Sequence, residues 1–195
     1  MSETVRSDHR PAPSTPSTPS TPSTTPAPAP SDEDLLVALL NTTPTDEGTH
    51  HDELAPDDQA HAWLNQHVPD APPDTDLVLL RATRSALQDV VRGQAGPQTL
   101  AAALSEVRLR PEVTHAGIAW RPETPDEAAV AARAVLAWGR VQADLPGRLR
   151  PCANTECSLF FIDRSRPNTG RWCSMAVCGN RMKSRRHYAR SKAEQ

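Results

Sequence analysis

The sequence predicts an α+β protein with a mainly helical N-terminal domain, a small β-hairpin within that domain, and a cysteine-rich C-terminal module. Three observations favour this organisation. Apolar residues after Ser31 recur at helical spacing, all four cysteines lie within residues 152–178, and the first thirty residues show no apolar periodicity. We therefore expect a disordered Ser/Thr/Pro-rich tail (1–30), a helical domain (31–147) and a small basic module (148–195).

Charge is divided unevenly along the chain. The net charge is −3, yet residues 148–195 carry eleven Lys/Arg against three acidic residues, a net charge of +8, whereas residues 1–147 carry −11. Such asymmetry indicates a nucleic acid or another acidic surface as partner of the basic part. No run of about 18 apolar residues occurs, so no membrane partner is expected. The start lacks the apolar segment of a secretory signal, so we expect a cytoplasmic protein.

Residues 11–30 form a low-complexity repeat of Pro, Ser, Thr and Ala. This composition restricts the chain to extended, polyproline-like conformers and offers no apolar face to a core. We interpret the segment as a spacer, or as an interaction or phosphorylation segment through its Ser/Thr-Pro pairs.

The first helix is predicted from an N-cap at Ser31 to Leu40. The three acidic residues after Ser31 suit the positive end of the helix dipole, and the leucines that follow are expected to face inward. Residues 46–56 are polar and predict a loop. Its His50 and His51 lie beside two acidic residues, so the loop is either solvated or a second metal site.

Further helices are predicted from the spacing of apolar residues. Two of them cover residues 57–67 and 76–92, and Pro97 suits the first turn of a third that ends near Ser105. The last helix of this domain is expected to begin at Thr124, whose side chain is predicted to cap the amide of Glu127.

Residues 107–109 and 115–121 are predicted to form the small β-hairpin. Apolar and polar residues alternate there, which is typical of strands with one buried face. The residues expected on that face are Val107, Leu109, Ile118 and Trp120. Trp63, Trp120 and Trp138 are interpreted as core residues or as walls of a ligand pocket, because their apolar area is large.

The cysteines follow the spacing Cys152-x4-Cys157-x15-Cys173-x4-Cys178. Each pair can bend around one ion, and clustering of this kind in a cytosolic chain favours a metal over disulfides. Four sulfur ligands without a spare cysteine are typical of a closed, tetrahedral Zn²⁺ site. An iron–sulfur cluster or four unrelated buried thiols are the alternatives. We predict one structural Zn²⁺.

A closed zinc site bears on both folding and function. A module of roughly forty residues cannot bury enough apolar surface to fold alone, so metal binding is expected to supply on the order of 10 kcal/mol. Four sulfur ligands leave no open position for water or substrate. The sequence contains no His-Glu-x-x-His, nucleophile-elbow or phosphate-loop motif. We therefore expect that the protein is not an enzyme.

Within the module, Leu159–Asp163 is predicted as a strand, 164–170 as a turn and Arg171–Cys173 as a short return strand. Ser174 is then a suitable N-cap for a helix that ends near Arg190. This order of knuckle, hairpin and ligand-bearing helix is typical of a treble-clef zinc finger. The predicted fold class is therefore completed by a treble-clef-like four-cysteine zinc finger.

The predicted C-terminal helix is densely basic. Positive charge on several faces of a helix suits contacts with phosphates, although a solvated face is the alternative. Tyr188 is placed either to stack on a base or to cover the hairpin. The candidate nucleic-acid-binding residues are Arg164, Arg166, Arg171, Arg181, Lys183, Arg185, Arg186 and Arg190.

Two resemblances to known families follow from these motifs. The run Arg171-Trp172-Cys173-Ser174-Met175-Ala176-Val177-Cys178-Gly179-Asn180-Arg181-x-Lys183, with Leu159-Phe160-x-x-Asp163-x-Ser165-Arg166 upstream, resembles the signature of the CGNR zinc-finger family. Residues 35–147 resemble the ABATE domain, a putative stress-induced transcription regulator that usually precedes this finger. That likeness is carried by Leu39-Leu40-Asn41-Thr42, Ala62-Trp63-Leu64 and Leu80-Arg81-x-x-Arg84-x-Ala86-Leu87.

The chain departs from the family pattern at two positions. Ala38 stands where the family often has an acid, which puts any ligand-pocket role of that acid in doubt. Gly170 replaces one Arg of a frequent Arg-Arg-Trp-Cys, which removes one expected phosphate contact but leaves the zinc ligands unchanged.

We predict a zinc-binding and nucleic-acid-binding transcription regulator, with DNA as the partner. Its N-terminal domain is expected to sense a small-molecule effector or a protein partner, and the protein would then lie at the nucleoid. The alternatives are an RNA-binding protein, a protein-interaction adaptor that uses the basic module, and a redox sensor that uses the zinc thiolates. A homodimer is a further expectation, because specific DNA readers are commonly dimers.

Overall fold

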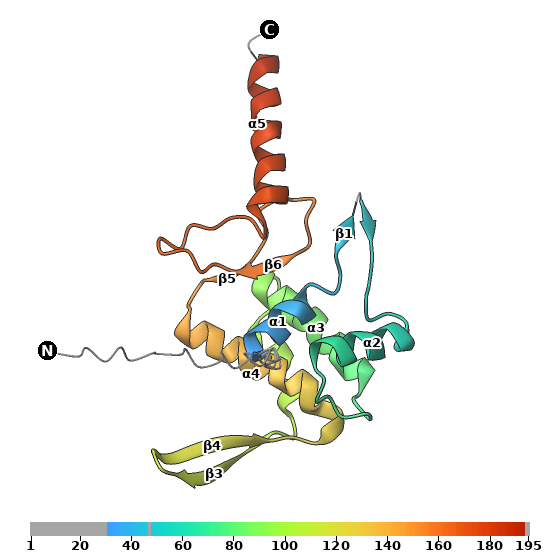
Figure 1. The fold of residues 1–195 in the computed structure, drawn as a ribbon, viewed down its shortest axis with the longest axis vertical. Coiled ribbons are helices and arrows are strands. Elements are labelled where there is room, and N and C mark those ends of the chain that lie inside the picture. Colours follow the sequence, from blue (N-terminus) through green and yellow to red (C-terminus); the bar gives the residue numbers. More distant parts are fainter. Residues whose placement is uncertain (1–30, 47, 194–195) are drawn as a thin grey trace, which may run out of the picture.

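The computed structural model describes residues 31–46 and 48–193, so the predicted tail, 1–30, lies outside the described residues. The molecule is mainly helical, with three small antiparallel sheets (Figure 1). The helices of the N-terminal part are α1 (Asp32–Leu40), α2 (Asp57–His67), α3 (Leu77–Arg92) and α4 (Ala129–Asp144), with the 3-10 helices η1 (Pro97–Leu104) and η2 (Asp126–Ala128).

Each sheet is a pair of antiparallel strands. The pairs are β1 (Thr45–Asp46) with β2 (Thr49–His50), β3 (Arg108–Thr114) with β4 (Gly117–Glu123), and β5 (Leu149–Pro151) with β6 (Phe160–Ile162). After β6 the chain forms a π-helical turn, η3 (Met175–Gly179), which leads directly into α5 (Asn180–Ala193). The predicted α+β class is therefore confirmed, including the small hairpin in the N-terminal part.

Side-chain caps begin α1 and α3. The Ser31 hydroxyl accepts a hydrogen bond from the amide of Asp34, and the Asp34 carboxylate accepts from the Ser31 amide at 3.1 Å, which completes a capping box. The Asp76 carboxylate accepts from the amides of Val78 and Leu79 at the start of α3. Helix α3 ends at Gly93, whose φ of 75° is the left-handed conformation that suits glycine at this position.

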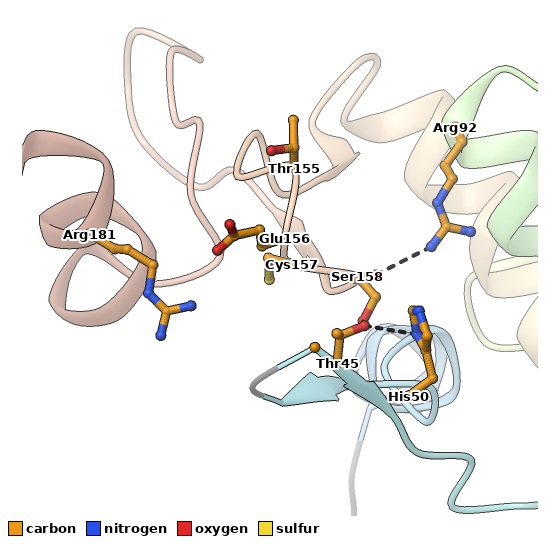
Figure 2. A pocket seen from close by; sticks show the side chains of 9 residues that line it. Thr45, His50, Arg92, Thr155, Glu156, Cys157, Ser158 and Arg181 are labelled. Atoms are coloured by element: carbon orange, nitrogen blue, oxygen red, sulfur yellow. Dashed lines mark hydrogen bonds between the residues drawn. The ribbon is translucent and has the colours of Figure 1, made fainter. Parts of the chain in front are cut away.

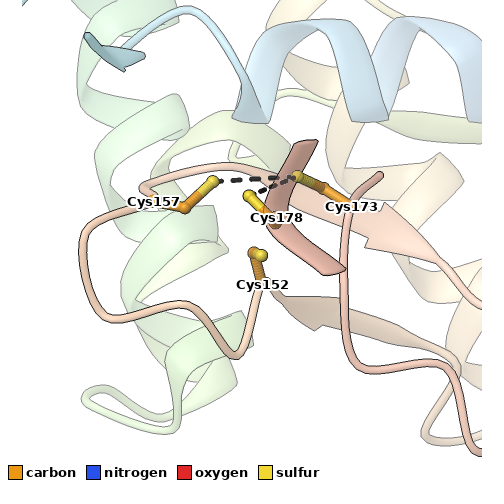
Figure 3. Close-up of side chains that lie close together, drawn as sticks. All are labelled: Cys152, Cys157, Cys173 and Cys178. Atoms are coloured by element: carbon orange, nitrogen blue, oxygen red, sulfur yellow. Dashed lines mark hydrogen bonds between the residues drawn. The ribbon is translucent and has the colours of Figure 1, made fainter. Parts of the chain in front are cut away.

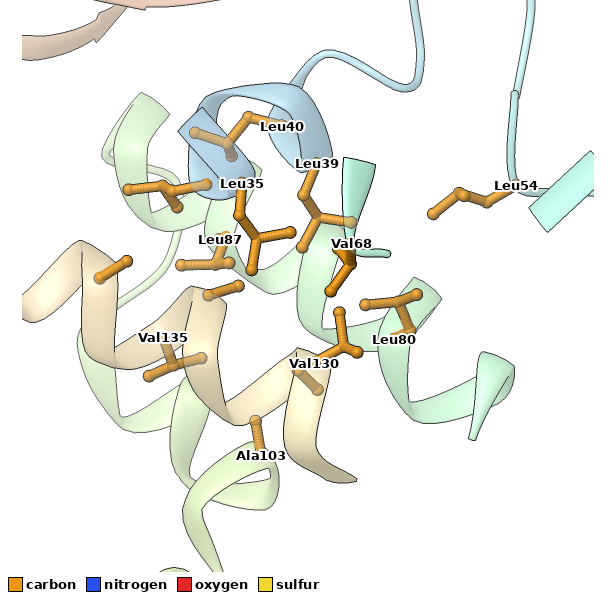
Figure 4. Packing of buried hydrophobic residues seen from close by; sticks show 14 of the residues in the cluster. Leu35, Leu39, Leu40, Leu54, Val68, Leu80, Leu87, Ala103, Val130 and Val135 are labelled. Atoms are coloured by element: carbon orange, nitrogen blue, oxygen red, sulfur yellow. The ribbon is translucent and has the colours of Figure 1, made fainter. Parts of the chain in front are cut away.

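The hydrophobic core lies among α1, α3 and α4, which pack against one another, with α2 and η1 at its margins (Figure 4). Leu35, Leu36 and Leu39 of α1 are buried, as the helical spacing predicts. Leu149 of β5 and Phe160 of β6 belong to the same core, and Phe160 is 1% exposed. The two predicted domains therefore share one apolar interior.

An ion pair between buried Arg84 and half-buried Asp52 supports the turn that follows α1. Arg84 on α3 donates to Asp52 at 2.5 and 2.9 Å, and also to the Thr42 hydroxyl at 3.3 Å. Burial acts to raise the pKa of Asp52, but the hydrogen bonds from Arg84 and from the Leu54 amide outweigh it and hold the pKa below its usual range. Gln88 donates to the Leu40 carbonyl at 2.8 Å. These contacts hold the turn against α3.

The structure differs from the sequence predictions in several local features. The predicted loop at 46–56 includes part of the short β1–β2 hairpin, and the predicted helix at Pro97 is a 3-10 helix. The predicted cap by Thr124 is absent, because η2 begins after Pro125 without a side-chain cap. Trp120 was interpreted as a core residue or as the wall of a ligand pocket, but it is 62% exposed.

Two elements project from the body of the molecule. Helix α5 extends from one end, and the β3–β4 hairpin extends from the opposite end (Figure 1). Across residues 31–46 and 48–193, no helix combines the length and the apolar character needed to cross a membrane.

Candidate metal centre and basic helix

The first pair of cysteines lies in the connection between β5 and β6. The two strands pair Leu149 with Ile162 and Pro151 with Phe160, and the Cys152 amide donates to the Leu159 carbonyl at 2.8 Å. The Cys157 amide donates to the Asn154 carbonyl at 2.9 Å, so the connection folds back on itself. This turn brings Cys157 to the same side as Cys152.

The second pair of cysteines lies at the start of the C-terminal helix. Ser174 is the N-cap of η3, as predicted, and its hydroxyl accepts from the amide of Val177. Cys178 is buried in this turn, and the side-chain amide of Asn154 donates to its sulfur at 3.6 Å. A Cβ atom at Gly179 would lie 2.7 Å from the sulfur of Met175, so the turn is closely packed here.

The four sulfur atoms converge on one point (Figure 3). They all lie within 4.8 Å of one another, with 3.7 Å between Cys157 and Cys173 and 3.8 Å between Cys173 and Cys178. Four sulfurs bound to Zn²⁺ at ~2.3 Å in a tetrahedron are separated by about 3.8 Å, so the arrangement fits this ion. Cys152, Cys157, Cys173 and Cys178 therefore form the structural Zn²⁺ site that the sequence predicts.

The environment of the thiols explains why a cation is needed. Burial raises the pKa of Cys157 to about 11 and also raises the pKa of Cys173, because it disfavours the charged thiolates, and the nearby cysteines add to the shift at Cys173. At Cys178, burial also acts upward, but hydrogen bonds from Asn154 and from the other cysteines lower the pKa. A divalent cation would keep all four as thiolates, which is the form that binds metal.

Of the two interpretations left open for the 46–56 loop, the second metal site is not formed in the part of the chain that the structure describes. Within the described residues, the four cysteines are the group placed to hold a metal, and neither His50 nor His51 belongs to it. His50 instead shares a hydrogen bond of 3.0 Å with the hydroxyl of Thr45 across the β1–β2 hairpin.

The loop after β6 is organised by the carboxylate of Asp163, which is 4% exposed. It accepts from the amides of Ser165 at 2.9 Å and Gly170 at 2.6 Å. Hydrogen bonds from Ser165, followed in effect by that from Gly170, hold the pKa of Asp163 below its usual range. A Cβ atom at Gly170 would lie 2.8 Å from this carboxyl group. Gly170 thus permits a close contact between its backbone and this carboxyl group.

The strand pairing in the module differs from the prediction. Arg171–Cys173 was predicted as the return strand, but β6 pairs with β5, for which no strand was predicted. The chain near Arg171 approaches the knuckle instead, because its carbonyl accepts from the Ala153 amide at 2.8 Å. The strand that pairs with β6 therefore precedes Cys152, the first zinc ligand.

Asn41 joins the zinc module to the helical part. Its side chain accepts from the Phe160 amide at 2.7 Å and donates to the Phe160 carbonyl at 3.1 Å, as a neighbouring strand would. The Ser158 hydroxyl donates to the Thr43 carbonyl at 2.7 Å, and the Arg92 guanidinium lies 4.5 Å from the centre of the Phe160 ring. The module is therefore docked through polar contacts around one buried aromatic ring.

A cleft of about 700 Å³ lies where the two parts meet (Figure 2). Arg92 from the end of α3, Arg181 from the start of α5 and His50 from β2 line it, together with Glu156 and Ser158 of the knuckle. Ala38, which replaces the family's frequent acid, packs against the core instead of lining this cleft.

The predicted nucleic-acid-binding residues fall into two groups. Arg181, Lys183, Arg185, Arg186 and Arg190 are all exposed on α5. Arg164, Arg166 and Arg171 lie in the loop between β6 and the metal site, where Arg164 forms an ion pair with Glu33 of α1 and Arg171 stacks at 5.2 Å on Trp172. Tyr188 is 76% exposed on α5. The structure thus gathers five of the eight predicted basic residues on one element.

Sequence reasoning did not identify the residues that connect the parts. Asn41 and Arg84 were interpreted as parts of family motifs. The available signal was an Asn directly after the predicted first helix, but its partner, Phe160, lies 119 residues away.

The fold and the site together define a zinc-finger protein in which a four-cysteine module is docked on a helical domain. Two family models match the chain: that of the ABATE family, described as putative stress-induced transcription regulator, over residues 33–145, and that of the CGNR zinc finger over residues 148–191. The chain therefore belongs to the ABATE family and carries a CGNR zinc finger, which confirms both resemblances. No match was found among curated proteins.

Proposed function

We propose that this protein is a non-catalytic regulator of transcription that binds duplex DNA through α5, with Zn²⁺ holding that helix in place. The proposal rests on the composition and position of α5. The helix contains six Lys/Arg and no acidic residue, and it projects from the metal site into solvent (Figure 1). Family membership supports the regulatory role, since the family is described as a putative transcription regulator.

The distribution of charge around α5 supports contact with phosphates. Successive residues of a helix are 100° apart, so Arg181, Lys183 and Arg186 point to different sides. A helix that is polar all round has no apolar face for a protein partner. Its length is about 21 Å at 1.5 Å per residue, and a single helix of this width fits the major groove of B-form DNA.

An ion pair also links α5 to the zinc knuckle. Arg185 donates to Glu156 of the zinc knuckle, with 2.5 Å between nitrogen and oxygen. This hydrogen bond from Arg185 lowers the pKa of Glu156, and the nearby charge of Arg181 acts in the same direction. Arg185 thus orients the helix, and we assign the phosphate contacts chiefly to Arg181, Lys183, Arg186 and Arg190.

Duplex DNA is favoured over RNA by the shape of the element. The major groove of an A-form RNA helix is too narrow and deep for a helix, whereas that of B-form DNA admits one. The adaptor alternative would place α5 against an acidic protein, such as the net negative N-terminal part. In the structure α5 points away from that part (Figure 1).

The proposal is tested by measuring affinity for duplex DNA across a salt series with the zinc-loaded protein. We expect Arg181→Gln/Arg186→Gln/Arg190→Gln to weaken binding and to reduce the slope of log K against log salt by roughly 3. Gln keeps helix propensity, and Arg185 is left to hold the helix. The matched control, Arg108→Gln/Arg110→Gln/Arg121→Gln, changes the net charge equally at the opposite end.

Equal loss in both triple variants would show that net charge, not α5, determines binding. Unchanged affinity in the α5 variant would refute the proposal. If structured RNA displaced duplex DNA in competition, RNA would be the partner instead of DNA. Crosslinking of the N-terminal part to α5 would favour the adaptor.

We further propose that the effector is a small anion that binds the cleft between the two parts. Arg92 and Arg181 come from different parts of the chain and line the same space, so a bound anion would connect α3 to the base of α5. Titration with inorganic phosphate, followed by amide NMR, is expected to shift residues near 92 and 181 in the wild type and not in Arg92→Gln. Absence of any shift at ~10 mM phosphate would overturn this assignment.

A further inference from the structure

The β3–β4 hairpin carries an apolar face with no cover from the rest of the described chain. Its register pairs Val113 with Ile118, Pro111 with Trp120 and Leu109 with Pro122, so these six side chains share one face. Val113 is 86% exposed, Ile118 68%, Trp120 62% and Leu109 59%. The hairpin projects away from the helical core, so the core does not bury this face (Figure 1).

The opposite face of the hairpin is polar, and charged side chains on it form ion pairs with one another. Arg110 pairs with Glu123 at 2.8 Å, and Arg121 pairs with Glu112 at 2.5 Å. Strands with one charged and one apolar face normally cover the apolar face with another layer. An isolated two-stranded sheet is only marginally stable in water, so a covering partner would also stabilise the hairpin.

We infer that this face is a self-association surface, on which the hairpin of a second copy of the chain packs face to face. The area supports a second copy as the occupant. The exposed apolar side chains present on the order of 500 Å², near the upper end of the patches found on monomeric proteins. Two such faces together bury on the order of 1,000 Å², which is the lower limit for a specific interface.

The edges of the hairpin favour this face-to-face arrangement over the addition of strands. Proline lacks an N–H group and fits a two-stranded ladder only where that group would point outward. Pro111 on β3 and Pro122 on β4 therefore each remove a donor from an outer edge. Prolines on edge strands prevent pairing with further strands. Two copies of the hairpin can therefore make contact through their apolar faces, as the two sheets of a β-sandwich do at a spacing of about 10 Å.

Other occupants fit the face less well. Nucleic acid is unsuited, because the face carries no charge. Residues 1–30 contain Met1 and Val5 as their large apolar residues other than prolines, too few to cover six side chains. A two-fold arrangement makes the same patch its own partner, so it requires no other protein. Because α5 lies at the opposite end, the dimer would leave both basic helices exposed (Figure 1).

Sedimentation of the zinc-loaded full chain, from low micromolar to about 100 µM, tests the inference. We expect a monomer–dimer equilibrium in the wild type, and amide exchange at residues 108–123 that slows as the dimer forms. Val113→Lys/Ile118→Glu makes the face polar while the opposite charges of the cross-strand pair support the hairpin. This variant is expected to raise the dimer dissociation constant at least tenfold.

The matched control is Glu112→Arg/Arg121→Glu, which reverses an ion pair on the polar face and is expected to leave the dimer unchanged. Exchange at 108–123 in the monomeric variant, compared with that of the diluted wild type, verifies that the hairpin is still formed. A wild type that stays monomeric at every concentration overturns the inference. So does a dimer that Val113→Lys/Ile118→Glu leaves intact, because another surface would then be responsible.

Discussion

The helical part and the zinc module contain different kinds of interior. The helices bury leucine, valine and alanine side chains against one another, with the Arg84–Asp52 ion pair at the margin of the core. The buried groups of the module, as far as the structure describes it, are two zinc ligands, Asn154, Gly179 and Asp163, besides Leu149 and Phe160. Those last two side chains belong to the helical core. The module therefore has almost no apolar interior of its own.

This difference indicates that the two parts owe their stability to different forces. Apolar burial contributes to folding whether or not a ligand is present, at roughly 25 cal/mol per Å². A structural zinc site contributes only when the ion is bound. Loss of the metal should thus separate the module from a core that stays folded, and substitutions at the junction should affect both parts.

Removal of zinc is the strongest test of this comparison. Cys173→Ser, or chelation of the wild type, should cost the module on the order of 10 kcal/mol and unfold residues 152–193. Hydrogen exchange should show lost protection in α5 and in the Asp163 loop, while α1, α3 and α4 stay protected. Ser85→Ala, at an exposed side chain of α3, provides a control that retains zinc. Retained protection of the module without metal would contradict the comparison.

The thiols add a pH dependence to zinc binding. An ordinary thiol is mostly protonated at neutral pH, and burial in the metal site raises the pKa of Cys157 further, so this thiol must lose its proton when the ion binds. Zinc affinity should therefore fall as the pH falls, and binding should release protons that calorimetry in buffers of different ionisation enthalpy can count.

Phe160 tests whether the two parts share a core. Phe160→Ala removes a ring that is 1% exposed and should lower the free energy of unfolding by about 3–5 kcal/mol, although the residue lies between two zinc ligands in sequence. Phe161→Ala is the matched control, because the ring of Phe161 is only partly buried. This substitution should lower the free energy of unfolding by about 1–2 kcal/mol. Equal effects in denaturant unfolding would argue against a shared core. The zinc content of both variants is expected to be that of the wild type.

The ion pair of Asp52 tests the polar margin of the helical part. Asp52→Asn leaves the buried Arg84 guanidinium without its anion and should cost about 3 kcal/mol. Asp57→Asn is the control, because Asp57 pairs with Arg81 at the same 2.5 Å but its side chain is 74% exposed. It should cost less than about 1 kcal/mol.

The pH dependence of Asp52 follows from its lowered pKa in the folded protein. Its contribution to stability is complete above the unfolded value, about pH 4, and is lost as the pH falls through the folded value. The difference in stability between the wild type and Asp52→Asn should therefore shrink below about pH 4. A difference that stays constant down to pH 2 would show that Asp52 does not act through its charge.

Sequence reasoning predicted the features that depend on neighbouring residues. Helix positions follow from apolar spacing and from caps such as Ser31, and the zinc ligands follow from the spacing of the cysteines. The structure confirms both, because a helix and a four-sulfur site each need only a few local rules.

The features that were missed depend on residues far apart in the sequence. The partner of β6 is β5 and not Arg171–Cys173, because strand pairing is decided by how the whole chain packs. Apolar alternation correctly identified a shared face for Leu109, Ile118 and Trp120, but alternation does not say what covers that face. The close contact between Gly170 and the Asp163 carboxylate likewise depends on how the loop folds, which residue spacing does not specify.

Asn41 is the clearest example of a residue whose partner is distant in sequence. Among the test substitutions, the one at Asn41 is expected to cause the smallest loss of stability. Asn41→Ala removes both hydrogen bonds to the backbone of Phe160 and should cost about 2 kcal/mol. Because this loss falls at the junction, the unfolding transitions followed by tryptophan fluorescence and by zinc release should coincide in the wild type and separate in the variant. Asn180→Ala is the control, since the exposed side chain of Asn180 donates to the Ala176 carbonyl of its own helical segment. Coincident transitions in Asn41→Ala would show that burial of Phe160 alone joins the two parts.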